Sequence, residues 1–311
     1  MNRLSLLLAF LLSLFLIITC YSLQPEEDVE EQTYSSLFEP EYDYEKQVVE
    51  AVPETSEEPT PGIEDPEQND SLIIKYDESP PASDLSFECP ASRSDLPSQI
   101  LHRKGYIVSY NKDTMQPNWA AWHLTAEHTD GEWARPSGNA FHEDTEVPAP
   151  RASNYDYKGS GWTRGHMCPA GDNRWDADAM YESFLLSNIC PQHTELNSGD
   201  WNDIEQECRR WAGKYGDIYI VCGPIFYRQT HEEIGYHKIP VPEAFFKVVL
   251  CLNSAPKGIG FICKNTDGNR KTDFYVNTIA QVERITGYIF FPQLSENIAS
   301  AVKGTASLEM W

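Results

Sequence analysis

Six polar side chains in the middle of the chain have the types and spacing of a candidate catalytic set. Residues 161–173 read GWTRGHMCPAGDN, which places a histidine directly after an arginine and a glycine. SNICPQ follows at 187–192, and LNSGDWNDIEQECRRW begins at 196. The composite pattern is R-G-H, N-x-x-P-Q and N-x₇-E-x₃-R. Its members are Arg164, His166, Asn188, Asn197, Glu205 and Arg209.

Each residue type in this set has a distinct chemical use. A neutral imidazole, here His166, can take a proton from water near neutral pH. The carboxamide oxygen of Asn197 is a hard, neutral ligand suited to Mg²⁺, and the Glu205 carboxylate can hold the waters that this ion keeps. The guanidinium groups of Arg164 and Arg209 can bind a phosphate that gains charge as it is attacked. The set therefore suits hydrolysis of a phosphodiester.

Each residue alone also has a structural explanation. His166 alone would be a loop histidine, Asn197 a helix cap, and Arg164 a partner for an acidic side chain. Glu205 and Arg209 are four residues apart and can form an ordinary helical ion pair worth about 0.3–0.5 kcal/mol. Two interpretations stay open for Asn188, which is either a site residue or a side chain that satisfies backbone groups in a buried turn. The spaced set as a whole favours a catalytic role for His166.

A zinc site is a further alternative for part of this stretch. His166-x-Cys168 and Cys190-x₂-His193 together offer two imidazoles and two thiols, which are enough ligands for a tetrahedral structural site. Only one residue separates the first two ligands. We therefore favour a Cys168–Cys190 disulfide or two buried thiols over zinc.

A predicted helix positions the last part of the set. It runs from an N-cap at Asn197 or Ser198 to Gly216. Apolar side chains recur at steps of three and four residues and predict its buried stripe. They are Trp201, Ile204, Cys208, Trp211 and Tyr215.

The remaining pattern indicates an α+β fold with an antiparallel sheet. Strands are predicted at 106–111, 119–125 and 217–223, a hairpin at 243–264 and a helix at 278–287. Residues 129–160 are rich in Gly, Pro and charge and predict a long surface loop. Residues 89–311 are long enough to bury one core as a single globular domain.

The first 88 residues have a different composition. One arginine and an apolar run at 4–18 are typical of an export signal over residues 1–20. Cys20 follows at once, as in a bacterial lipoprotein, and an uncleaved membrane anchor is the alternative. Residues 21–88 hold 21 Asp or Glu and two Lys, a net charge of −19, which predicts a disordered acidic tether. We therefore expect an exported domain that is secreted or tethered at the cell surface or outer membrane.

Seven further cysteines follow Cys20. In an exported domain they are disulfide candidates with one left over. Cys251 and Cys263 flank the predicted hairpin, and we expect them to pair across it.

The charge of the domain excludes a strongly basic nucleic-acid footprint. Residues 89–311 carry a net charge of −6, out of −24 for the whole chain. A hydrolase needs only a local basic cleft, so we expect weak substrate binding that is sensitive to salt. Candidate cleft residues are Arg151, Lys158, Arg164, Arg174, Arg209 and Arg210.

The run from Trp162 to Tyr215 resembles the core of the DNA/RNA non-specific endonucleases, sugar-non-specific nucleases of the ββα-metal superfamily. A looser resemblance covers nearly all of residues 89–292. It implies a ββα-metal motif in the active site and a Mg²⁺-dependent endonuclease, with Mn²⁺ as a substitute, that cuts DNA and RNA and leaves 5′-phosphate ends. The implied roles are His166 as general base, Asn197 as sole direct metal ligand, Glu205 as holder of metal waters, Arg164 and Arg209 as transition-state stabilisers, and Asn188 as a further active-site asparagine.

One position departs from the family pattern, which usually reads D-R-G-H. Thr163 stands in place of the aspartate. A threonine can hydrogen-bond but brings no charge, so the departure concerns the rate more than the reaction. The alternative function is a surface binding or scaffold lipoprotein on a degenerate nuclease fold.

Overall fold

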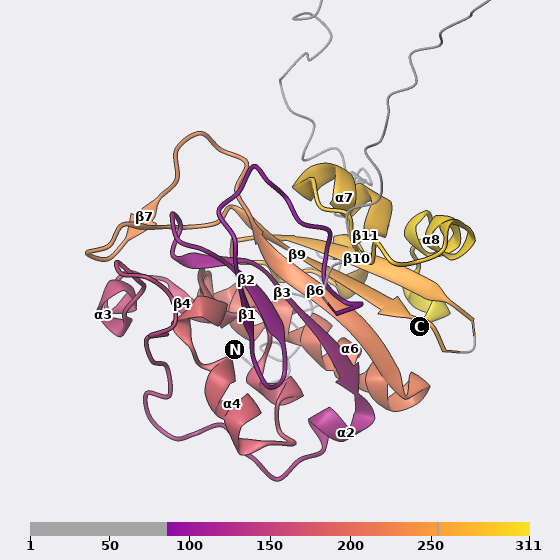
Figure 1. Ribbon diagram of the computed structural model, residues 1–311, viewed down its shortest axis with the longest axis horizontal. Helices are drawn as coiled ribbons and strands as arrows, with labels where there is room; N and C mark the ends of the chain where they lie inside the picture. Colours follow the sequence, from indigo (N-terminus) through magenta and orange to yellow (C-terminus); the bar gives the residue numbers. More distant parts are fainter. Residues whose placement is uncertain (1–85, 254) are drawn as a thin grey trace, which may run out of the picture. The chain divides into compact units, whose positions relative to one another are not determined.

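A seven-stranded antiparallel sheet runs through the part of the chain that the structure, a computed structural model, describes: residues 86–253 and 255–311. Its spatial order is β1-β2-β3-β6-β9-β10-β11 (Figure 1). The strands are β1 (Gln99–His102), β2 (Ile107–Asn111), β3 (Gln116–Thr125), β6 (Asp217–Ile225), β9 (Ala244–Cys251), β10 (Lys257–Lys264) and β11 (Val276–Asn277). The predicted α+β class, antiparallel sheet and hairpin are confirmed. The predicted signal, the Cys20 anchor and the acidic tether lie outside the described residues.

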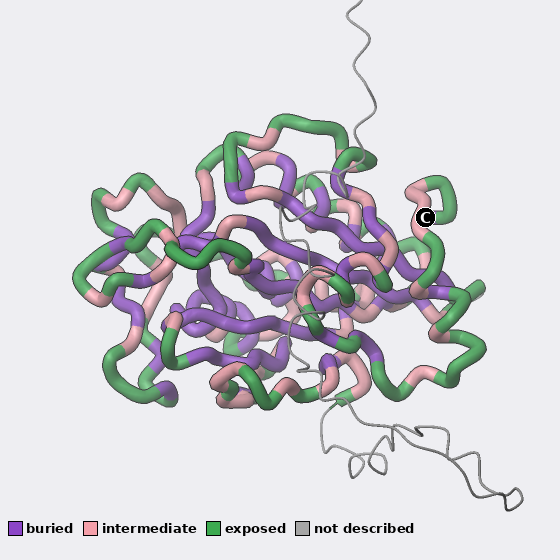
Figure 2. The backbone as a smooth tube through the Cα atoms, turned by 90° about the horizontal axis from the view of Figure 1, so that it is seen from above, coloured by how far each residue is buried: buried purple, intermediate pink, exposed green. Residues whose placement is uncertain are grey.

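Side chains of the central strands alternate between two covered faces. On β9, Phe245 and Lys247 contact Trp201 of α6, whereas the intervening Phe246 packs against Tyr288 near the other end of the chain. Every residue of β9 is buried, and its sequence AFFKVVLC is nearly continuously apolar, as expected for a strand covered on both faces. Figure 2 shows these buried strands passing through the middle of the described part, with exposed turns around them.

Helices cover both faces of the sheet. The longer ones are α4 (Ala177–Ser183), α6 (Asp200–Tyr215), α7 (Ile279–Thr286) and α8 (Glu296–Lys303), and the shorter ones are α2 (Ala126–Thr129), α3 (Asn154–Tyr157) and α5 (Thr194–Ser198). α7 and α8 lie beside β10 and β11, whereas α3 and α4 lie toward the other half of the molecule (Figure 1). No helix within the described ranges combines the length and apolarity needed to cross a bilayer.

A small hairpin followed by α6 forms a ββα unit beside the sheet. β4 (Thr163–His166) pairs antiparallel with β5 (Ile189–Gln192), and α5 and α6 follow. Gly165 lies on β4 where a Cβ atom would come within 2.2 Å of Oε1 of Gln192. The glycine of the R-G-H sequence is therefore required by the close approach of the Gln192 side chain.

The predicted start of the long helix is wrong by a few residues. Asn197 lies inside α5, and Gly199 separates α5 from α6. The amide of Gly199 donates to the carbonyl of Glu195, which closes α5 before α6 begins. The predicted end at Gly216 is confirmed, because this residue has a φ of 94° that favours glycine.

The predicted surface loop at 129–160 is partly buried. Val147, Ala152 and Tyr157 are among its buried residues. The Asp156 carboxylate accepts hydrogen bonds from the backbone amide and hydroxyl of Ser153, which forms the start of α3. Local capping therefore organises a segment that composition alone assigns to a loop.

The predicted disulfides are absent from the described residues, where all seven cysteines are free and buried. In the β9–β10 register, Cys251 faces Lys257 and Cys263 faces Phe245, so the two thiols lie at opposite ends of the hairpin. Cys168 and Cys190 are two buried thiols, the alternative to a bridge. The predicted Cys251–Cys263 disulfide is wrong because only residues that lie opposite each other on adjacent strands are close enough to form one.

Candidate active site

A cavity of about 300 Å³ lies between the end of β4, the segment that follows it and one face of α6. Its polar lining residues are Arg135, His166, Arg174, Asn197, Asn202, Glu205 and Arg209. Three guanidinium groups face a single carboxylate, so the lining is suited to an anion such as a phosphate. The cavity brings together four of the six residues that the sequence singles out.

His166 ends β4 with its ring packed among aromatic side chains. The ring centroid lies 5.2 Å from that of Phe141 and 5.0 Å from that of Phe184. The residue is only 9% exposed, and its buried Nε2 atom has no hydrogen-bond partner. Burial, reinforced by the positive charge of Arg135, lowers the pKa of His166 to about 3. The imidazole is therefore neutral at physiological pH and can accept a proton.

Phe141 connects His166 to two arginines. The guanidinium carbon of Arg164 lies 5.4 Å from the Phe141 ring centroid, and that of Arg135 lies 5.7 Å from it. Arg164 donates to the backbone oxygen of Asn154 at 3.1 Å, and burial lowers its pKa. Arg164 thus contacts Phe141 but does not line the cavity, whereas the exposed Arg135 lines it directly.

Thr163 fixes the orientation of the Asn197 carboxamide. The Thr163 hydroxyl donates its one hydrogen to the carbonyl of Gln192 at 2.7 Å. It can therefore only accept the 3.0 Å hydrogen bond from the Asn197 amide nitrogen. This contact turns the carboxamide oxygen away from Thr163. The threonine that replaces the family aspartate thus still orients the candidate metal ligand, without adding a charge.

Glu205 is the carboxylate of the cavity. Burial raises its pKa to about 7, although the positive charges of Lys247 and Arg209 oppose this shift. The neutral and ionised forms of Glu205 are therefore close in free energy near physiological pH. A cation placed beside the carboxylate would favour the ionised form.

Arg209 is held by a partner that the sequence interpretation did not include. Its Nη1 atom donates to Oδ1 of Asp172 at 2.8 Å, and Trp122 donates to the other Asp172 oxygen at 3.0 Å. A Cβ atom on Gly171 would lie 2.9 Å from the Arg209 guanidinium, so the glycine makes room for this side chain. The ion pair expected between Glu205 and Arg209 is replaced by the pair between Arg209 and Asp172.

Asn188 holds the backbone that follows His166. Its Oδ1 atom accepts from the amide of Cys168 at 2.9 Å, and its Nδ2 atom donates to the Cys168 carbonyl at 2.8 Å and the Ser183 carbonyl at 2.9 Å. The residue is fully buried and does not line the cavity. The contacts are those of the structural interpretation, in which Asn188 satisfies backbone groups.

Sequence reasoning missed Arg135, Phe141 and Asp172. Two of them come from the segment that composition assigns to a plain loop, although an arginine and an aromatic residue in a Gly- and Pro-rich stretch are themselves a signal. Asp172 lies in the PAGDN turn, a few residues after R-G-H. An acidic side chain in this otherwise uncharged turn was the available signal of a partner for an arginine.

The zinc alternative is not supported by the arrangement of the side chains. No group of three or more His, Cys, Asp or Glu in the described ranges can hold a metal ion. Nδ1 of His193 instead accepts from the Glu195 amide at the start of α5. Its ring also packs edge-on against Trp162. His193 is therefore a helix cap.

Only part of the predicted basic cleft lines the cavity. Arg174 and Arg209 do so. Arg151 instead donates to the carbonyl oxygens of Asp144 and Val147, and Arg210 forms an exposed ion pair with Glu207. The cleft is therefore smaller than the sequence suggests, although Arg135 adds to it.

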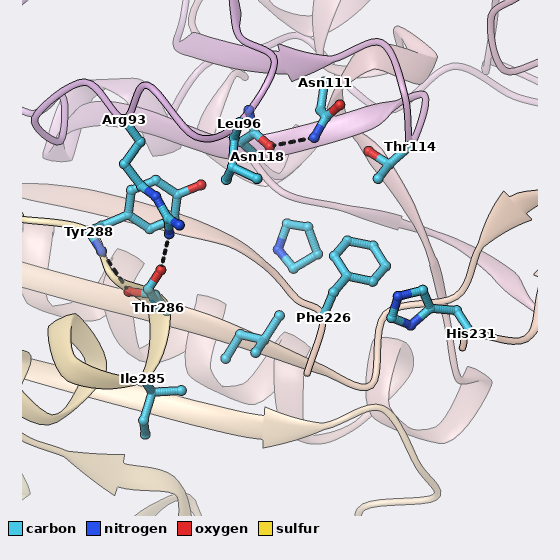
Figure 3. Close-up of a pocket in the computed structure, with 12 residues that line it drawn as sticks. Arg93, Leu96, Asn111, Thr114, Asn118, Phe226, His231, Ile285, Thr286 and Tyr288 are labelled. Atoms are coloured by element: carbon cyan, nitrogen blue, oxygen red, sulfur yellow. Dashed lines mark hydrogen bonds between the residues drawn. The ribbon is translucent and has the colours of Figure 1, made fainter. Parts of the chain in front are cut away.

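A second, larger crevice of about 370 Å³ lies where β2 and β6 end and β3 begins (Figure 3). Its polar side chains are engaged with the protein itself. Asn111 donates to Asn118 at 3.1 Å, and Arg93 donates to the Thr286 carbonyl. His231 contacts the Glu243 carboxylate at 2.8 Å. The crevice therefore offers space, but few polar groups that a ligand could use.

Comparison with known proteins identifies the group to which this arrangement is related. Residues 88–297 match the family described as DNA/RNA non-specific endonuclease. The chain is 33% identical over 240 residues to "Nuclease EXOG, mitochondrial" of Xenopus laevis, covering 72% of this chain and 65% of that protein. It is 33% identical over 224 residues to "Endonuclease G, mitochondrial" of Bos taurus, covering 67% and 74%. The match thus spans slightly less than two thirds of the Xenopus protein.

The fold is also found in a solved structure. The chain superposes with a TM-score of 0.61 on a chain from the crystal structure of the EndoG/EndoGI complex. The match covers 67% of this chain and 93% of the other, at 27% identity.

The expected export to the cell surface is wrong. The EXOG and Endonuclease G relatives are named as mitochondrial nucleases rather than as exported or surface proteins. An apolar N-terminal run shows an affinity for membranes but does not specify which one, because targeting signals are recognised by receptors. The free thiols are consistent with this correction, because only disulfides would have required an oxidising compartment.

Proposed function

Because the chain belongs to the DNA/RNA non-specific endonuclease family, we propose that it hydrolyses phosphodiester bonds of DNA and RNA with His166 as the general base. The observation that carries this proposal is the unpartnered, buried Nε2 atom of a neutral His166 in a cavity with three arginines. A buried nitrogen without a partner is unfavourable unless a function requires it.

His166 removes a proton from a water molecule, and the resulting hydroxide attacks phosphorus in line with the leaving 3′-oxygen. The product ends then carry 5′-phosphates. A pKa of about 3 makes the imidazole a weak base in the empty cavity. A bound phosphate counteracts the positive field of Arg135 and raises this pKa, so the base becomes stronger when substrate is present.

The arginines bind the phosphate and stabilise the negative charge that develops on it during attack. Arg209 is held in place by Asp172, and Arg135 and Arg174 also line the cavity. Preorganised cationic donors of this kind stabilise a transition state more than the ground state. Arg164 supports them through Phe141, whose ring it shares with Arg135.

The residues present fit a hydrated divalent cation, which we propose is Mg²⁺, with Mn²⁺ as a substitute. Asn197 presents its carboxamide oxygen because Thr163 holds the amide nitrogen, and Glu205 supplies a carboxylate for the waters of the ion. When bound, the cation supplies positive charge that stabilises the attacked phosphate and the leaving oxygen. Glu205 and Asn197 orient it relative to His166.

A plasmid-nicking assay with Mg²⁺, Mn²⁺ or EDTA tests this function. We expect cutting with either metal, none with EDTA, and product ends that a ligase joins without prior kinase treatment. The same assay with RNA tests the range of substrates. A protein that binds nucleic acid but never cuts it with either metal would instead be the scaffold on a degenerate nuclease fold.

We also propose that the protein acts in mitochondria and that the nuclease domain begins near residue 89. The mitochondrial names of the relatives and the start of the family match at residue 88 support these proposals. Subcellular fractionation of the full chain tests the location. Limited proteolysis tests the domain boundary.

A further inference from the structure

Beneath the candidate active site, a lysine is buried where lysines are rarely found. Lys247 lies on the central strand β9, on the face that α6 covers, and is 1% exposed. Its ammonium nitrogen is 4.3 Å from the ring centroid of Trp201 and 5.4 Å from that of Trp122. Burying a charge is expensive unless other charges or rings compensate it, so this position requires an explanation.

The two indole rings lead from Lys247 to the cavity. Trp122 donates to Asp172, which holds Arg209. Trp201 is one turn before Glu205 on α6 and therefore lies on the neighbouring face of the same helix. Trp201 thus links Lys247 to Glu205, whereas Trp122 and Asp172 together link it to Arg209.

The charges of this cluster balance only when Lys247 is counted. Asp172 and Glu205 are acidic, whereas Arg209 and Lys247 are basic. The thiols of Cys208 and Cys222 also face the cluster, but burial raises the pKa of each to about 12, so they stay neutral. The compensating negative charge for Lys247 therefore comes from Asp172 and from the ionised form of Glu205.

Electrostatic coupling supports this arrangement. Burial alone would lower the pKa of Lys247, but the negative charges of Glu205 and Asp172 contribute to raising it above its usual value. In turn, the charge of Lys247 opposes the effect of burial on both carboxylates. Without Lys247, one of the two carboxylates would have to take up a proton or leave its place.

We propose that Lys247 is a positioning residue for the cleavage reaction: its buried ammonium balances Asp172 and Glu205 and, through Trp122 and Trp201, holds Arg209 and Glu205 facing the cavity. This inference rests on the proposed function for its effect on cutting. Its effect on the balance of buried charge is independent of that function.

The test compares Lys247→Met and Lys247→Arg with a matched control. Lys257 is a second buried lysine on the same face of the sheet, 7% exposed and 3.7 Å from the ring centroid of Tyr215, but it does not line the cavity. We expect Lys247→Met to lower kcat for nicking about 10- to 100-fold with little change in KM, as for loss of a supporting residue. Lys247→Arg should retain most of the activity, and Lys257→Met should leave nicking unchanged. Equal nicking by the parent and Lys247→Met overturns the proposal.

A second measurement does not depend on nuclease activity. Urea midpoints in EDTA are compared for Lys247→Met, Glu205→Gln and the double variant. We expect Lys247→Met to lower the midpoint clearly less in the Glu205→Gln background, because the unbalanced charge is already removed. An equal loss in both backgrounds means that Lys247 only fills space, which overturns the proposal even if the enzyme cuts.

Folding itself decides the outcome if Lys247→Met cannot be purified. The proposal then requires Lys247→Arg to fold and the Lys247→Met/Glu205→Gln double variant to fold better than Lys247→Met. If Lys247→Arg is as unstable as Lys247→Met, position 247 requires the shape of lysine rather than its charge, and the proposal is overturned. If every variant and the parent fail to cut while the midpoints follow the expected cycle, the proposed function fails and the role of Lys247 in charge balance stands.

Discussion

Two hollows of comparable size differ in what their polar side chains contact. In the crevice at the end of the sheet, Arg93 and Asn111 bond to neighbouring protein groups (Figure 3). In the cavity beside α6, Nε2 of His166 is buried without a partner. The crevice is the larger of the two, at about 370 against about 300 Å³. An unpartnered histidine nitrogen, rather than volume, therefore distinguishes the cavity from the crevice.

The most direct test of this comparison replaces one histidine in each hollow. We expect His166→Ala to reduce nicking by about 100- to 10,000-fold, the range of a general base's contribution. His231→Ala in the crevice should lower stability, because it removes one of the two partners of the Glu243 carboxylate, yet it should retain nicking. Initial rates on plasmid and urea midpoints measure the two effects. Equal losses of activity would remove the distinction between the hollows.

The arginines offer a second, smaller contrast. Removal of Arg209 should reduce kcat about 100-fold, the scale of losing one transition-state donor. It should also destabilise the fold, because Asp172 stays buried with one partner fewer. Arg93→Ala removes the contact with Thr286 but should leave kcat within about twofold of the parent. An Arg209→Ala enzyme that cuts normally would exclude this residue from the site.

Thr163 gives a third contrast, of about tenfold. Thr163→Val removes the hydroxyl that orients Asn197, and a supporting contact of this kind is worth about 10- to 100-fold in activity or metal affinity. Thr163→Ser keeps the hydroxyl and should behave like the parent, as should Thr114→Val in the crevice. When nicking is measured as a function of Mn²⁺ concentration, Thr163→Val should need a higher concentration than the parent to reach half of its maximal rate. Identical metal curves would show that Thr163 does not orient the ligand.

The smallest expected effect is on the pH dependence of stability in EDTA. The folded pKa of His166 is about 3, below the ordinary value of 6.5, so the unfolded chain binds the proton first and stability falls as pH drops from 6.5 toward 3. The folded pKa of Glu205 is about 7, above the ordinary 4.5, so its contribution is full below 4.5 and is lost as pH rises through 7.

The two substitutions should therefore flatten opposite limbs of the profile. His166→Gln should reduce the loss of stability on the acid side, and Glu205→Gln should reduce the loss between pH 4.5 and 7. Urea midpoints from pH 4 to 8 measure both. His231→Gln in the crevice serves as the control. A parallel displacement of the whole profile in either variant would contradict the assigned shift.

The part of the site that depends on local spacing was predictable from the sequence. His166, Asn197, Glu205 and Arg209 meet in the cavity because β4 and the consecutive helices α5 and α6 carry them. The central strands and α7 were predictable for the same reason, since periodicity and capping residues act over a few positions.

The remainder depends on contacts between distant segments. Arg135 and Phe141 reach His166 from a loop without periodicity, and local pattern cannot show where such a loop docks. The partner of Arg209 is Asp172 rather than Glu205, because the PAGDN turn folds back over α6. The disulfide between Cys251 and Cys263 failed for the same reason, since strand register rather than distance from the turn decides which side chains meet.

Helix α6 carries three of the cavity residues, Asn202, Glu205 and Arg209, and also buries Trp201, Ile204, Cys208 and Trp211 in the core. Part of the catalytic geometry and part of the core thus depend on the same sixteen residues. On warming, the enzyme should lose turnover and protection of its α6 amides from hydrogen exchange over one temperature range, with no inactive but folded species between them.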